Sequence, residues 1–233
     1  MQIFSVVVKG GYLMYPIIAC SIIALAVFLE RWYVLRIARD KVKKYVRSLR
    51  KALNQKDLAA VIEVSQKHPG PASRIILAGL RRYFNGYPRE AKEGMEMVAM
   101  QEFPIFEKRL GVLTTIASIS PLLGLLGTVT GMIKTFDIIS IVGVGRPMEM
   151  AGGISEALIT TAAGLSVAIP TVIAHHYLSG VAEETINDIE KISTEVLEII
   201  DEETNNWETL ENNSSEERGI YVPVPSSEEE AQA

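Results

Sequence analysis

Three long stretches of this sequence carry no charged side chain, and they constrain the fold more than any other feature. They are residues 10–29, 110–133 and 157–174. The hydrocarbon core of a bilayer is about 30 Å thick, so a helix needs about 20 mainly apolar residues to cross it. The first two stretches reach that length, and the third reaches it with its flanks, from Ile154 to Leu178. The sequence therefore predicts an all-α membrane protein with three transmembrane helices.

The first apolar stretch is predicted to be a retained helix and not a cleaved signal peptide. Only Lys9 precedes it, whereas many positive charges follow it, which reverses the order found in a secretory signal. Its Cys20 is the only cysteine of the chain. We interpret Cys20 as a small apolar helix residue, because a single cysteine forms no intramolecular disulfide.

The sign of charge is segregated along the chain. Residues 30–109 hold 18 Lys or Arg and 9 Asp or Glu, whereas residues 183–233 hold 16 acids and two basic residues. An excess of Lys and Arg beside a span marks its cytoplasmic side. We therefore expect the N-terminus outside and both the 30–109 segment and the C-terminus in the cytoplasm. Because the basic residues adjoin a membrane helix and form no recognition motif, anionic lipid is favoured over nucleic acid as their partner.

The apolar segments divide the chain into regions of alternating location. In order, these are a short outside N-terminus (1–9), transmembrane helix 1 (10–29), a cytoplasmic helical region (30–109), transmembrane helix 2 (110–133), a periplasmic or outside loop (134–153), transmembrane helix 3 (154–178), a cytoplasmic helix (179–204) and an acidic, disordered tail (205–233). The second and third transmembrane helices are expected to extend into the cytoplasm.

Within the cytoplasmic region we expect several helices. One is predicted over residues 41–53, and Asp57 is predicted to cap the next. A third is predicted over residues 72–84. Helix-favouring residues then run from Pro88 to Ile133, which predicts one long helix bent at Pro104.

The second span carries polar and small residues at helical spacing. Thr114, Pro121, Thr128 and Thr135 are seven residues apart and therefore share a helix face. Gly127 and Gly131 form a GxxxG pattern, which permits close approach of another helix. Pro121 deprives a carbonyl one turn earlier of its usual donor, so a neighbour or water must satisfy it.

The third span repeats these features. Thr160, Thr161 and Gly164 follow Glu156, and Pro170 interrupts the hydrogen-bond ladder as Pro121 does. A single threonine in such a helix is as well explained by a bond to its own backbone. The ordered stripe of hydroxyl groups favours a hydrated path shared by the two spans. Glu156 has two interpretations, as an acid at the pathway mouth or as a helix N-terminal acid stabilised by the macrodipole.

The sequence shows no motif of an enzyme, metal site or cofactor site. It lacks Cys/His zinc spacing, a GxxxxGKS/T phosphate loop and a GxSxG elbow. The adjacent His175 and His176 point about 100° apart on a helix, which suits a joint metal site poorly. The spans also hold no Asp, Lys or Arg at mid-membrane, so any proton crossing here is expected to use a titrating group from a second protein.

Two segments together resemble a known family. SPLLGLLGTVTGMIKTF (120–136) and GGISEALITTAAGLSVAIPTVIAHHYL (152–178) are similar to the MotA/TolQ/ExbB proton channel family, and ExbB and TolQ resemble the chain more than four-span MotA does. The resemblance covers about residues 10–200. It implies a bacterial inner-membrane protein that assembles as a homo-oligomeric, pentameric ring.

The resemblance also implies partners and residue roles. The second and third spans would line a pore around the helix of a single-span ExbD- or TolR-like partner, whose transmembrane Asp accepts protons, and a TonB- or TolA-like protein would receive the force. By motif position the pore threonines fall on Thr128 and Thr161 and the acidic residue on Glu156, while Thr160 adds a second hydroxyl. The acidic tail lies outside the family pattern.

Several functions remain open at this level. TonB-dependent uptake, Tol-type envelope maintenance and a motility stator share the same module, and either protons or sodium ions could be the coupling ion. A non-conducting scaffold would also need the small-residue faces of the two spans. A solute transporter is disfavoured, because three spans show no inverted repeat and no pair of broken helices.

Overall fold

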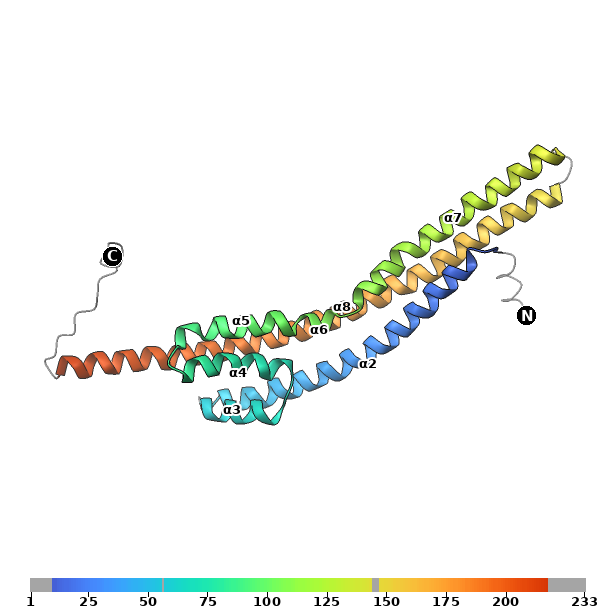
Figure 1. The fold of residues 1–233 in the computed structure, drawn as a ribbon. Coiled ribbons are helices and arrows are strands. Elements are labelled where there is room, and N and C mark those ends of the chain that lie inside the picture. Colours follow the sequence, from blue (N-terminus) through green and yellow to red (C-terminus); the bar gives the residue numbers. More distant parts are fainter. Residues whose placement is uncertain (1–9, 56, 144–146, 218–233) are drawn as a thin grey trace, which may run out of the picture. The chain divides into compact units, whose positions relative to one another are not determined.

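The computed structural model describes residues 10–55, 57–143 and 147–217. Every regular element in these ranges is a helix, which confirms the all-α prediction. In chain order the elements are α2 (Met14–Leu53), α3 (Leu58–Lys67), α4 (Pro71–Phe84), the short helix η1 (Pro88–Glu90), α5 (Ala91–Glu102), α6 (Pro104–Glu107), α7 (Leu110–Val142) and α8 (Pro147–Glu217) (Figure 1). Three of them, α2, α7 and α8, are long and apolar enough to cross a membrane, as predicted.

The chain folds into two compact units. The first comprises Met1–Val42 and Glu102–Asn187, and the second comprises Lys43–Gln101 and Asp188–Ala233. The first unit contains all three apolar segments. The second contains α3, α4, most of α5 and the distal parts of α2 and α8.

In the first unit α7 and α8 pack directly against each other. Gly124 of α7 lies against Thr161 of α8. Further along α7, Gly131 lies against Gly153, which comes earlier on α8, so the two helices are antiparallel. The first part of α2 contributes to the same core. Buried apolar side chains of this unit include Met14, Ile17, Ala24, Leu35, Leu113, Ile116, Ala157, Ala168 and Leu178.

The junction between α6 and α7 is held by α2. Arg109 at this junction has a left-handed φ of 64°. Arg31 is only 4% exposed, and its Nη2 donates to the carbonyls of Ile105 at 3.0 Å and Phe106 at 2.9 Å. Arg109 in turn donates to Glu30. Because a helix end leaves carbonyls without intrahelical donors, the guanidinium of Arg31 satisfies groups that the break exposes.

The second unit is a small helical bundle. The carboxylate of Asp57 accepts hydrogen bonds from the N–H groups of Ala59 at 2.9 Å and Ala60 at 3.2 Å, which confirms the predicted cap of α3. The hydroxyl of Tyr45 on α2 lies 2.7 Å from that of Ser65 on α3. Burial raises the pKa of Tyr45, so this phenol stays protonated at neutral pH.

The distal part of α8 closes this bundle. Ile189, Ile192, Val196 and Ile200 are fully buried within the chain, at 0% exposure. In the sequence, Ile189, Ile192, Val196 and Ile199 repeat at 3-4-3 spacing, a pattern that predicts a helix packed against other copies of itself. That interpretation is wrong, because α2 and α4 of the same chain contact this part of α8, as the bonds of Arg50 to Glu195 and Tyr83 to Glu203 show.

Several helices differ in extent from the sequence-based expectation. Residues 41–53 form no separate helix but are the end of α2. The expected helix from Pro88 to Ile133 is divided into η1, α5, α6 and α7. Pro104 begins α6 and does not merely bend a longer helix, consistent with the preference of proline for a first helical turn.

The two long helices also extend beyond their apolar stretches. Most of the 134–153 segment, expected as a loop, is helical, since α7 continues to Val142 and α8 begins at Pro147. Lys134 ends the charge-free stretch 110–133 without ending the helix. Gly143 ends α7 with a φ of 72°, a conformation that glycine adopts without steric cost. Similarly, α8 continues through residues 205–217, which were expected to be disordered. The tail from residue 218 onward lies outside the described residues.

Candidate functional site

The predicted site lies along the contact between α7 and α8, where both helices present small residues. A methyl group at Gly131 would lie 2.7 Å from the carbonyl oxygen of Gly153. At Gly164 it would lie 2.5 Å from the carbonyl oxygen of Ser120. Side chains at these positions would therefore push the two backbones apart, which is the geometric reason for glycine in this contact.

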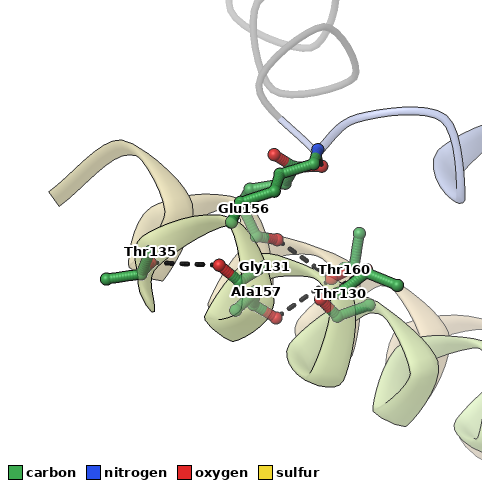
Figure 2. Close-up of polar contacts among 8 residues, drawn as sticks. Thr130, Gly131, Thr135, Glu156, Ala157 and Thr160 are labelled. Carbon is green, nitrogen blue, oxygen red and sulfur yellow. Dashed lines mark hydrogen bonds and ion pairs between the residues drawn. The ribbon is translucent and has the colours of Figure 1, made fainter. Parts of the chain in front are cut away.

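Threonines of α8 face this contact. The hydroxyl of Thr161 donates to the carbonyl of Gly124 on α7 at 3.0 Å, so it joins the two helices directly. Thr160 is 1% exposed and donates to the carbonyls of Glu156 at 2.9 Å and Ala157 at 3.0 Å on its own helix (Figure 2). A side chain added at Gly127 would overlap Thr160, which places Thr160 directly beside the GxxxG pattern.

The threonines of α7 follow a line that changes environment along the helix. Thr128 is half-buried, and its hydroxyl donates to the carbonyl of Leu125 at 2.6 Å. Thr114 is exposed, whereas Thr135 is 3% exposed and donates to Gly131 at 3.0 Å. A straight helix drifts about 20° per seven residues, so positions at this spacing rotate gradually across its surface. The residues predicted to share one face therefore do not share one environment. Thr114 lies on the surface, and Thr135 lies in the α7–α8 contact.

Glu156 forms an ion pair within the chain. The Nζ atom of Lys134 on α7 lies 2.5 Å from Oε1 of Glu156, whose side chain is 17% exposed. The same carboxylate packs against Gly11, where any added side chain would overlap it. Glu156 lies more than two turns inside α8, which begins at Pro147. The macrodipole interpretation is therefore wrong, because that effect falls off within the first turn.

The two prolines lie within continuous helices. Pro121 is inside α7 and Pro170 inside α8. Pro170 also lines an open, mainly apolar groove of about 600 Å³ between α2 and α8. Beside it, the hydroxyl of Thr171 donates to the carbonyl of Val167 on the same helix at 2.7 Å.

The chemistry that this contact can perform is limited. Its threonine hydroxyls at positions 128, 135, 160 and 161 each donate to a carbonyl. Their oxygen atoms keep lone pairs that can accept from water. The buried hydroxyl of Ser120 has no hydrogen-bond partner among the described residues. Thr128 and Thr161 are half-buried and so remain accessible on one side. A threonine hydroxyl orients water but does not bind a proton near neutral pH. The hydroxyl groups of this contact can therefore support a hydrated path.

Sequence reasoning did not identify several residues of this site. Lys134 was assigned to a loop, although its position just after the second span places it opposite Glu156 in an antiparallel hairpin. The seven-residue spacing does not include Ser120, which is fully buried and whose backbone carbonyl lies against Gly164. Gly11 and Tyr12 carried no signal, because their role depends on how α2 meets α7 and α8.

Comparison with known proteins places this site in a family. A family model described as the MotA/TolQ/ExbB proton channel family matches residues 67–191, which is more than half of the chain. The chain belongs to this family. The matched region contains every residue predicted for the pathway and for the packing of α7 with α8. It also contains Lys134, which the sequence did not predict as a site residue.

Individual relatives within the MotA/TolQ/ExbB family cover most of the chain. It is 37% identical over 199 residues to a biopolymer transport protein named ExbB-like 1 in Synechocystis sp., spanning 82% of this chain and 76% of that protein. It is 31% identical over 185 residues to biopolymer transport protein exbB1 of Vibrio cholerae, with coverages of 77% and 80%. It is 30% identical over 195 residues to the Tol-Pal system protein TolQ of Pseudomonas aeruginosa, with coverages of 78% and 82%. The chain is thus a multi-pass membrane protein of the ExbB/TolQ proton-channel type.

Proposed function

We propose that this chain is the ring subunit of a motor in the bacterial inner membrane, driven by the proton-motive force. In this proposal the α7–α8 pairs of five copies surround the transmembrane helix of an ExbD- or TolR-like partner. Protons cross beside Thr128 and Thr161 and bind the partner's Asp. The observation that carries the proposal is the bond from Thr161 to Gly124, which sets hydroxyl groups between two closely packed membrane helices.

The physical chemistry of the spans supports a partner with its own carboxylate. Ionisable groups inside a membrane are costly and generally functional. The family resemblance implies that one such group, the Asp of the partner, takes part in proton transfer. The spans supply small residues, which leave room for water, and hydroxyl groups, which orient it. They hold no Asp, Lys or Arg at mid-membrane to relay the proton. We also infer that the chain moves ions and is not an enzyme, since its polar groups serve packing and hydration.

The surface of α7 and α8 supports assembly of several copies. Both helices expose many large apolar side chains, among them Leu122, Leu125, Leu126, Val129, Leu158, Leu165, Ile169 and Ile173. Such surface can contact lipid or a neighbouring subunit. The five-fold ring itself comes from the family resemblance and forms part of the proposal.

The proposed motor would transmit force to a process in the cell envelope. Relatives named as biopolymer transport proteins and relatives named as Tol-Pal system proteins match with comparable identity. TonB-dependent uptake with a TonB-like protein is our first candidate, and Tol-type maintenance with a TolA-like protein is the second. A motility stator is the third candidate.

The main competitor is a scaffold that assembles but conducts no ions. To separate the two, the gene would be deleted and complemented, and TonB-dependent uptake and envelope integrity would be measured with and without a protonophore. The motor predicts that complementation restores one of these activities and that the protonophore abolishes it. Complemented activity that persists under a protonophore would support the scaffold and overturn the motor.

A further inference from the structure

The ion pair at Glu156 joins three parts of the chain. Lys134 comes from α7, Glu156 from α8, and the residues before α2 complete the cluster. Nζ of Lys134 lies 2.5 Å from Oε1 of Glu156 and 5.8 Å from the centroid of the Tyr12 ring. In Figure 2 the Glu156 side chain extends from α8 toward the segment that leads into α2. The ammonium is therefore held by a carboxylate and by an aromatic face, each of which attracts a cation.

The cluster encloses the carboxylate more than the ammonium. The side chain of Glu156 is 17% exposed, and that of Lys134 is 46% exposed. Gly11 has a φ of 68°, and a Cβ at this position would overlap the Glu156 carboxylate. Gly11 thus allows the backbone to cover one side of the carboxylate, while the ammonium occupies another. A solute ion that approached Glu156 would have to displace one of them.

The chemistry of this arrangement bears on which ion can use the path. Unpaired Asp and Glu side chains at the mouth of a pathway attract cations and help to select them. Hard metal cations bind through oxygen ligands such as carboxylates. Here the Glu156 carboxylate is already neutralised by the ammonium of Lys134, a residue of the same chain. This positive charge also repels cations. A proton does not need this carboxylate as a ligand, because it can move through hydrogen-bonded water and hydroxyl groups.

We propose that Lys134 is a specificity-determining residue, which denies the Glu156 carboxylate to Na⁺ and thereby reserves the pathway for protons. The proposal rests on the proposed function and adds a selectivity device to it. Lys134 is not among the residues to which the family resemblance gives a role, which are Thr128, Thr161 and Glu156.

The test uses the full chain reconstituted in liposomes with its single-span partner. Proton flux is measured in NaCl and in N-methyl-D-glucamine chloride, and uptake of radioactive Na⁺ is measured separately. Wild-type flux should be the same in both salts, with Na⁺ uptake at background. Lys134→Met should raise Na⁺ uptake at least about tenfold, equivalent to about 1.4 kcal/mol. Lys134→Arg keeps the charge and should behave as wild type, and Lys51→Met serves as a control for loss of an exposed lysine.

A double variant separates electrostatics from general damage. Adding Glu156→Gln to Lys134→Met removes the unpaired carboxylate, so Na⁺ uptake should return to background. Wild-type proton flux together with Na⁺ uptake that is unchanged in Lys134→Met would overturn the inference. Na⁺ uptake by the wild type, or loss of complex assembly in Lys134→Arg, would overturn it as well. Absence of wild-type proton flux would instead count against the proposed function.

Discussion

At the scale of single residues, the same side-chain type has different roles according to its place on α7 or α8. Thr160 is buried and bonds only to its own helix, whereas the adjacent Thr161 bonds across to α7. Thr128 is half-buried and bonds to its own helix. Sequence spacing could place all three on membrane helices. It could not distinguish a bond within a helix from one between helices, because that depends on the register of the pair.

The double variant Thr128→Val with Thr161→Val should abolish proton flux, and the proposed ring should still assemble. Valine keeps the volume of threonine but removes the hydroxyl group that orients water. Loss of the bond from Thr161 to Gly124 should cost only about 1 kcal/mol of stability. Flux in liposomes and the mass of the complex in detergent would check both parts. Thr115→Val, which removes an exposed hydroxyl bonded to Gly111, is the control, and full flux in the double variant would refute the assignment.

The buried Arg31 is predicted to be a stability residue. Arg31→Met should lower the free energy of unfolding by about 2 kcal/mol, because two carbonyl groups at the α6–α7 junction lose a charged donor. Thermal unfolding in detergent would measure the change. Arg36→Met is a matched control, since Arg36 lies 5.4 Å from the ring of Trp32 and its loss should cost less than about 1 kcal/mol. Equal destabilisation by both variants would argue against the role given to the junction.

At the scale of elements, apolar length predicted the three long helices but not where they end. The charge-free stretches end at Leu29, Ile133 and Ala174, whereas α2, α7 and α8 continue well beyond them. A change from apolar to polar residues marks a change of solvent and not the end of a hydrogen-bonded helix. The Asp57 cap was predictable because it depends on a local side-chain bond. The break at Arg109 was not, because Arg31 stabilises it from 78 positions away in sequence.

Two glycines of α8 should respond in opposite ways to alanine. At Gly164 a Cβ would lie 2.5 Å from the carbonyl oxygen of Ser120, so Gly164→Ala should separate α7 from α8 and destabilise the protein by about 1–3 kcal/mol. At Gly180 nothing lies within 4 Å, so Gly180→Ala should stabilise the helix by about 0.5–1 kcal/mol. Thermal unfolding of both variants in one detergent checks the pair. A neutral Gly164→Ala would mean that the two helices are not in close contact.

At the scale of the whole molecule, the fold class and the family could be predicted from sequence, and the two compact units could not. Three apolar segments suffice for a three-span protein. The split at Val42 and Asn187 divides α2 and α8 internally. It therefore depends on which side chains each helix part buries, such as Leu35 in one unit and Ile192 in the other. No local sequence signal marks such a division.

The orientation predicted from charge can be tested in cells. In a Cys20→Ser background, Ser140→Cys should react with a membrane-impermeant maleimide in intact cells, because the predicted orientation places the end of α7 outside. Asn54→Cys, just after α2, should react only after the membrane is permeabilised, since basic residues beside a span stay in the cytoplasm. The reverse pattern would invert the topology.

Proton flux through liposomes that contain this chain and the proposed single-span partner would show whether the two form a proton channel. Flux should need both chains and should disappear when the transmembrane Asp of the partner is replaced by Asn. A stable complex that shows no flux at any applied membrane potential would contradict this prediction.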